Sequence, residues 1–228
     1  MNALSFAASL DEAMADVAHR VQRSLVVVHN GKRGAGAGVI WRAGGFIVTN
    51  YHVVAHRRGR SPHPLHATLP DGQELPARLL AEAEHLDLAL LQVETDGLQP
   101  ALIADSQSMK VGQIVFAVGH PWGQLGYVTS GVISSLGTAQ SGNGRGGSAQ
   151  ISVPIVRSDV LLAPGNSGGP LVDSAGGVLG INTMVVGGDQ GVAIPSHVVE
   201  SFINQALGGR PTQDSGEPVA DKKAGDWV

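Results

Sequence analysis

The stretch Pro164-Gly165-Asn166-Ser167-Gly168-Gly169-Pro170 is the most distinctive in the sequence, because it encloses a serine in small residues. The hydroxyl of such a serine is unshielded, and glycine permits backbone conformations that bulkier residues avoid. Backbone N–H groups that converge there would stabilise the negative oxygen of an acyl-transfer transition state. We therefore expect an oxyanion hole over Gly165, Asn166 and Ser167, with the amides of Gly165 and Ser167 as donors. A plain glycine–serine turn is the alternative.

A nucleophilic serine needs a base, and His52 has the most suitable surroundings of the nine histidines. It lies just after the apolar segment Phe46 to Thr49, so a rigid strand end would aim its imidazole. His52 and His56 also form an H-x-x-x-H pair. The zinc-protease pattern H-E-x-x-H requires a glutamate where Val53 stands, so we expect no metal.

The histidine in turn needs an acceptor that fixes its tautomer and stabilises its charged form. Asp87 is the candidate, because it is an ionisable residue inside the apolar run Leu86 to Leu91. A buried carboxylate is costly unless it is paired, so its presence suggests a partner. The surrounding segment, Ala77 to Val93, is ambiguous by itself. Its composition favours a helix with Asp87 on the wet face, while its apolar core also fits a buried strand.

Composition narrows the class of protein. The 228 residues carry a formal charge of −4, only 15% of them are charged, and 32 are glycine. Few charges and many glycines favour tight turns and β structure, and the charge balance excludes a basic nucleic-acid-binding surface. The lack of cysteine excludes disulfides and cysteine nucleophiles. No leader peptide or membrane-length apolar stretch is visible, so we expect a cytoplasmic chain as written, or a periplasmic one if a signal was removed.

The order of elements predicts two β lobes, because short apolar segments form two groups separated near residues 96–111. We expect a helix over Ser9 to Arg23 before them and a short helix from Ser196 to Leu207 after them. The organisation is an N-terminal segment over 1–23, a folded domain over 24–207 with lobes at about 24–104 and 105–195, and a tail over 208–228. The expected strands are 24–29, 35–41, 46–49, 65–69, 73–80, 113–118, 127–136, 149–153, 177–186 and 191–194.

Three motifs occur in the order histidine, aspartate, serine: Thr49 to Val54, Asp87 to Leu91, and Gly165 to Pro170. They resemble the HtrA/DegP group of trypsin-like serine proteases. Glycine-rich residues at 34–38 and the segment Gly191 to Pro195 extend the resemblance, which covers about residues 17–202.

This resemblance implies an all-β protease domain of two six-stranded, antiparallel, chymotrypsin-like barrels, with an N-terminal and a short C-terminal helix. It implies a catalytic triad of His52, Asp87 and Ser167 between the barrels, and it resolves residues 77–93 as strand. Because few residues follow Phe202 in this sequence, we expect a protease domain without the PDZ domain that many members carry.

The resemblance also suggests where a substrate binds. It places Leu161 and Leu162 at the wall of the primary specificity pocket, which predicts cleavage after small or medium apolar residues. The strand around Asn182, Thr183, Met184 and Val185 would pair with an extended substrate backbone. The loops at 138–148, 161–166 and 186–190 are expected to switch between inactive and active arrangements.

The expected function is hydrolysis of peptide bonds in unfolded or misfolded proteins, without a cofactor. The expected partners are polypeptide substrates and, in a homotrimer, other copies of the chain. Two alternatives differ in class. A non-catalytic or gated peptide-binding module on the same fold stays open, whereas an α/β-hydrolase esterase fails because its triad runs in the order serine, acid, histidine.

Overall fold

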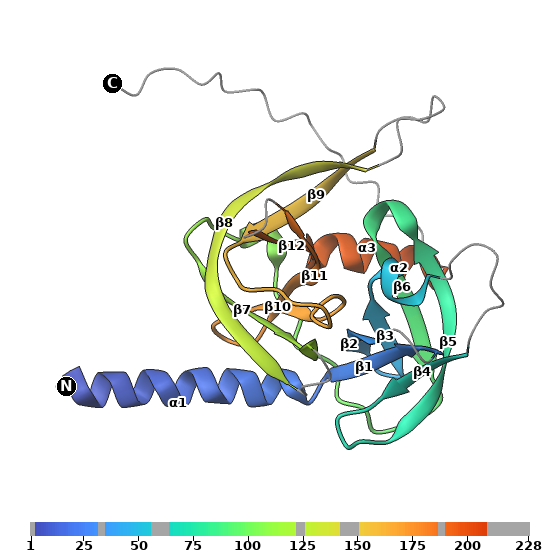
Figure 1. The fold of residues 1–228 in the computed structure, drawn as a ribbon, viewed down its shortest axis with the longest axis horizontal. Coiled ribbons are helices and arrows are strands. Elements are labelled where there is room, and N and C mark those ends of the chain that lie inside the picture. Colours follow the sequence, from blue (N-terminus) through green and yellow to red (C-terminus); the bar gives the residue numbers. More distant parts are fainter. Residues whose placement is uncertain are drawn as a thin grey trace.

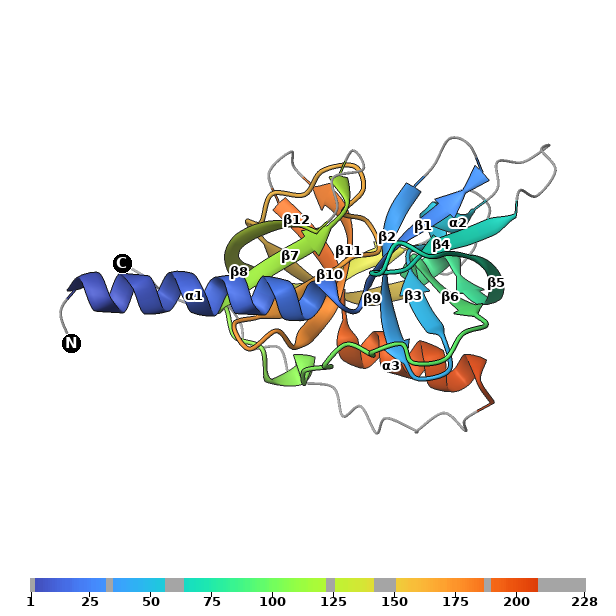
Figure 2. The same ribbon diagram turned by 90° about the horizontal axis from the view of Figure 1, so that it is seen from below.

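The computed structural model consists of two β-barrels side by side, with one helix extending from them and another lying along them (Figures 1 and 2). Each barrel is closed and contains six strands, with antiparallel pairing throughout. This confirms the chymotrypsin-like double barrel expected from the sequence. The structure describes residues 3–31, 35–55, 64–121, 126–141, 151–186 and 190–208.

The first barrel has the strand order β1-β2-β3-β6-β5-β4 and closes through the pairing of β1 with β4. A one-turn helix, α2, follows β3, and a short 3₁₀ helix, η2, separates β5 from β6. Its elements are β1 Leu25–Asn30, β2 Ala35–Arg42, β3 Phe46–Thr49, α2 Tyr51–Val54, β4 Leu65–Thr68, β5 Glu74–Ala83, η2 Glu84–Leu86 and β6 Leu88–Val93.

The second barrel has the order β10-β11-β12-β9-β8-β7 and closes through the pairing of β10 with β7. A 3₁₀ helix, η3, precedes it along the chain. Its elements are η3 Ser106–Ser108, β7 Ile114–Gly119, β8 Tyr127–Ser141, β9 Ile151–Ser158, β10 Pro170–Asp173, β11 Val178–Val186 and β12 Gln190–Pro195.

The continuous apolar runs of the sequence arise because several strands are buried on both faces. In β6, Leu88 and Leu90 face the cluster between the barrels, whereas Ala89 and Leu91 face the interior of the first barrel. Because side chains alternate along a strand, burial of both faces removes the polar alternation that marks an ordinary strand. Double burial therefore explains the ambiguity of the apolar run in β6, whereas the part of β5 within residues 77–93 contains no buried residue; the segment forms the end of β5, η2 and β6.

Two helices pack against the barrels. Helix α1, Ala3–Gln22, buries Val17 and Val21 in the shared cluster, and its earlier turns project past the body (Figure 2). Helix α3, Ser196–Ala206, contacts strands of both barrels, and its Glu200 pairs with Arg42 and accepts a 2.6 Å hydrogen bond from Trp41 Nε1. None of the helices in the described ranges is long and apolar enough to cross a membrane.

Several elements differ from the sequence expectations, and β9 continues to Ser158, five residues past its expected end. Helix α1 begins at Ala3 rather than Ser9, since Leu4 and the alanines before Ser9 are strong helix formers. Strand β8 continues to Ser141, so the first part of the loop expected at 138–148 is strand, and residues 142–148 lie outside the described ranges. Strand β10 was not expected, because it has four residues and begins with a proline. Pairing with β7 and β11 defines this strand more than its own composition does.

Candidate active site

His52 and Asp87 meet at the edge of the first barrel. His52 lies on α2, one turn after β3, and Asp87 lies between η2 and β6. The Nδ1 atom of His52 is 2.8 Å from Asp87 Oδ2, and the His52 backbone N–H donates to Oδ1 at 3.0 Å. Asp87 therefore receives the ring and the backbone of the same histidine, an arrangement that fixes the imidazole.

The backbone of Asp87 adopts an uncommon conformation. Its φ of 53° and ψ of 42° are left-handed, and among the described residues it is the only non-glycine with positive φ. Left-handed backbone is strained for most L-residues, although aspartate tolerates it better than most. Asn50 Nδ2 donates to the Asp87 carbonyl at 2.9 Å, and the Asp87 N–H donates to the Glu84 carbonyl at 3.1 Å. These bonds anchor the peptide groups on both sides of Asp87.

Ser167 approaches this pair from the second barrel, just before β10. Its Oγ donates to the Thr183 carbonyl at 3.2 Å, and the Thr183 hydroxyl donates to Asp87 Oδ2. Thr183 of β11 thus contacts the serine and the carboxylate at once. His52 and Ser167, both within the described ranges, share no hydrogen bond in this arrangement.

A tight turn precedes the serine. The Asn166 N–H donates to the Ala163 carbonyl at 2.9 Å, and Gly165 has φ of 106°. Proline followed by a glycine of positive φ is typical of a type II turn. The Gly165 carbonyl accepts from the His120 N–H at 3.1 Å. Within the described part of the chain, the amides of Gly165 and Ser167 donate to no other group, whereas the Asn166 amide is used in the turn.

The two leucines expected at the specificity pocket differ in packing and exposure. Leu162 packs against the second-barrel core, and a Cβ on Gly191 would lie 3.1 Å from its Cδ1. Leu161 is 65% exposed, and its carbonyl accepts from Thr129 Oγ1. Asp159, the nearest preceding acid, binds the backbone N–H of Val132 at 2.6 Å. Of the two, only Leu162 lies against Gly191.

The four residues expected to bind a substrate backbone also differ in their backbone pairing. Asn182 is buried, and its N–H and carbonyl bond to Gly169 and Gly168. After Asn182, β11 has no further partner on its β10 side within the described ranges. Thr183, Met184 and Val185 therefore leave one strand edge open, and the side chains of Met184 and Val185 are exposed.

Sequence reasoning missed the buried His120, which lies in contact with the turn before Ser167. Burial lowers its pKa from 6.5 to about 4; the Val26 carbonyl acts in the opposite direction, and His29 lowers the pKa further. Its Nδ1 accepts from the Gly126 N–H at 3.2 Å, while Nε2 has no hydrogen-bond partner of good geometry among the described groups. The ring borders a hollow of about 380 Å³ between β1 and the turn after β4.

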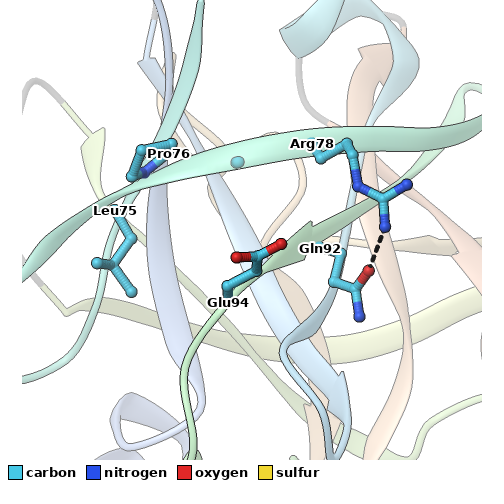
Figure 3. Close-up of a pocket in the computed structure, with 6 residues that line it drawn as sticks. Leu75, Pro76, Arg78, Gln92 and Glu94 are labelled. Carbon is cyan, nitrogen blue, oxygen red and sulfur yellow. Dashed lines mark hydrogen bonds between the residues drawn. The ribbon is translucent and has the colours of Figure 1, made fainter.

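A second hollow, of about 410 Å³, lies on strands β5 and β6 of the first barrel (Figure 3). Leu75 and Pro76 line one side, and Arg78 lies beside Gln92 with a 2.7 Å hydrogen bond between them. None of the expected site residues borders it. It is therefore separate from the candidate active site.

Comparison with known proteins identifies the class. The sequence model of the trypsin-like peptidase domain matches residues 36–181, and the chain belongs to this family. Within the family its relatives are HtrA/DegP proteases. It is 37% identical over 179 residues to a probable periplasmic serine endoprotease DegP-like of Halomonas elongata. The matched region covers 76% of this chain and 35% of the relative. It is also 37% identical over 182 residues to Protease Do-like 1, chloroplastic, of Arabidopsis thaliana, covering 77% and 40%.

Solved structures agree with this placement. The HtrA-type protease AlgW with tripeptide aligns with a TM-score of 0.71 at 30% identity, covering 85% of this chain and 63% of that one. The serine endoprotease from Yersinia pestis aligns with a TM-score of 0.70 at 28% identity, covering 85% and 66%. The chain spans well under half the length of the curated relatives named above.

Proposed function

We propose that this chain is a serine endopeptidase in which Ser167 attacks the substrate carbonyl, His52 accepts the serine proton and Asp87 orients the imidazole. The position of Thr183 carries the proposal. Its carbonyl binds Ser167 and its hydroxyl binds Asp87, so one residue holds the nucleophile and the carboxylate of different barrels together. General-base activation of a serine requires the nucleophile, the base and the carboxylate that orients the base to lie near one another.

The proton path follows from the hydrogen bonds of the resting site. Nδ1 of His52 is engaged with Asp87, which leaves Nε2 as the ring nitrogen that would accept the serine proton. Ser167 Oγ first rotates away from the Thr183 carbonyl toward Nε2, and the freed carbonyl then accepts a substrate N–H. Nε2 later donates the proton to the leaving amine. The acyl group now remains on Ser167 as an ester. Water attacks this ester with Nε2 again as the base, and the carboxylic acid and free Ser167 are released.

The amides of Gly165 and Ser167 are the proposed oxyanion donors. Both donate to no other described group, and Gly165 holds the positive-φ position of the turn before the serine. The His120 N–H binds the Gly165 carbonyl at 3.1 Å and so anchors the peptide group between Gly165 and Asn166. The loss of one such donor typically lowers turnover by about 10²–10³-fold.

The open edge of β11 supports an extended polypeptide as substrate. A peptide that pairs with Thr183, Met184 and Val185 must present a free backbone, which unfolded proteins offer and folded ones conceal. Leu162 beside Gly191 would give the proposed specificity pocket an apolar wall. We therefore propose cleavage after small or medium apolar residues in unfolded or misfolded proteins.

Mass-spectrometric mapping of fragments from a denatured protein tests the proposal, with Ser167→Ala as the inactive control. We expect cuts after Val, Ala or Leu that vanish with the variant, and cuts mainly after Lys or Arg would contradict the proposed pocket. A fluorophosphonate probe should label Ser167. A folded chain that binds unfolded polypeptide, remains unlabelled and produces no fragments would instead be a peptide-binding module.

A further inference from the structure

We propose that Thr49 is a positioning residue for the nucleophile, acting across the boundary between the barrels. The inference rests on the proposed function, in which Ser167 of one barrel must meet His52 of the other. It concerns the contacts that set the distance between these two groups. Thr49 is fully buried and lies three residues before His52.

The contact begins at Ala37 of β2, whose two backbone polar groups leave the sheet. Its N–H donates to the Ser167 carbonyl at 2.8 Å, and its carbonyl accepts from Thr49 Oγ1 at 2.7 Å. In an antiparallel strand the N–H and C=O of one residue point to the same side. Both groups of Ala37 therefore lie on one edge of β2, where the N–H reaches Ser167 of the second barrel and the carbonyl is held by Thr49 of the first.

The sheet itself cannot satisfy the Ala37 carbonyl. Strand β3 pairs with β2 as far as Val48 and Val39, and the chain enters α2 soon afterwards. The Thr49 side chain supplies the donor that the next ladder position would have provided. A buried carbonyl left without a donor is costly, so the Thr49 hydroxyl fixes the course of β2 at this point.

Gly168 makes the arrangement rigid. Its φ is 83°, its N–H donates to the Asn182 carbonyl at 2.9 Å, and a Cβ placed on it would clash with the Ala37 carbonyl and with Thr49 Oγ1. The residue after the nucleophile thus packs directly on the Thr49–Ala37 contact. A movement at this contact must therefore displace Ser167 relative to His52.

Thr49→Val provides the test because valine matches threonine in shape but cannot donate. A methyl carbon cannot approach a carbonyl oxygen as closely as the 2.7 Å of this hydrogen bond, so β2 should move by roughly half an ångström. Because a misplacement of about 1 Å can cost 10²-fold in rate, we expect turnover and fluorophosphonate labelling to fall about tenfold. KM should change less than about twofold, because Thr49 would not touch the substrate.

Two further variants separate positioning from simple stabilisation. Thr49→Ser retains the donor and should label within about threefold of the wild type, although it loses a methyl contact. Thr68→Val makes the same chemical change at a hydroxyl that pairs with His29, and it should leave labelling unchanged. Thermal melting, measured for all variants, shows that each is folded at the assay temperature.

The outcomes are distinguishable from those of the proposed function. If wild-type Ser167 is not labelled, the endopeptidase proposal fails, and the positioning role of Thr49 fails with it. If wild type is labelled and folded Thr49→Val reacts at the wild-type rate, only the positioning inference is overturned. Should Thr49→Val not fold, the comparison of Thr49→Ser with Thr49→Ala decides: equal labelling rates would refute the role of the hydroxyl.

Discussion

The buried imidazole of His120 predicts a loss of stability in mild acid. His120 is only 8% exposed. Burial lowers the pKa of its imidazole from the ordinary value of 6.5 to about 4 in the folded chain. Above pH 6.5 the ring is neutral in both states and contributes nothing. As the pH falls from 6.5 toward 4, His120 binds a proton in the unfolded chain but stays largely neutral in the folded chain, so the folded state loses stability. The loss is complete below the folded pKa.

The magnitude follows from the two pKa values. At pH 5 proton binding favours the unfolded state by a factor of about 30, which corresponds to about 2 kcal/mol. We expect His120→Asn to abolish this term, because asparagine does not titrate and its Oδ1 can replace Nδ1 as acceptor for the Gly126 N–H. The His120 backbone N–H that binds Gly165 is retained in the variant.

Urea unfolding of wild type and His120→Asn between pH 8 and pH 5 measures the effect. The difference between their free energies of unfolding should shift by about 2 kcal/mol toward the variant across this range. Other titrating groups contribute to both proteins and cancel in the comparison. The reasoning would be refuted if the two stability profiles stayed parallel, since His120 would then take up protons equally in both states.

Three further predictions concern the site. Asp87→Asn should lower turnover by roughly 10⁴-fold with little change in folding, because asparagine stabilises the wrong tautomer of His52; steady-state kinetics with a peptide substrate measures this, and a loss below tenfold would contradict the role of Asp87. Gly168→Ala should abolish probe labelling and lower the melting temperature, because its positive φ and the close backbone leave no room for a methyl group; a fully labelled, equally stable variant would disprove that packing. Leu162→Ala should enlarge the pocket and move cleavage toward larger apolar residues, with Leu161→Ala as the exposed control; unchanged fragment maps would exclude Leu162 from the pocket wall.

The sequence alone predicted most of the strands and the residue types proposed to carry the chemistry. Val-rich runs, glycine turns and the order His52, Asp87, Ser167 depend on local composition and spacing, so they can be predicted without coordinates. The same local logic failed for β10, whose four residues are a strand only because two neighbours pair with them. It also left residues 77–93 undecided, since burial of β6 on both faces removes the alternation there, and the Ala, Leu and Glu content of the segment favours a helix.

Only the tertiary structure decided how the two barrels meet. Thr183 lies 96 residues from Asp87, yet its hydroxyl binds that carboxylate, and Ala37 binds Ser167 through backbone atoms that every residue possesses. Such contacts cannot be predicted from the spacing of residues along the sequence, because they depend on how two separately closed barrels pack on each other. The pKa of His120 likewise depends on what the fold packs around the ring. Sequence thus specified the side chains proposed to react, and the packing of one barrel on the other sets their positions.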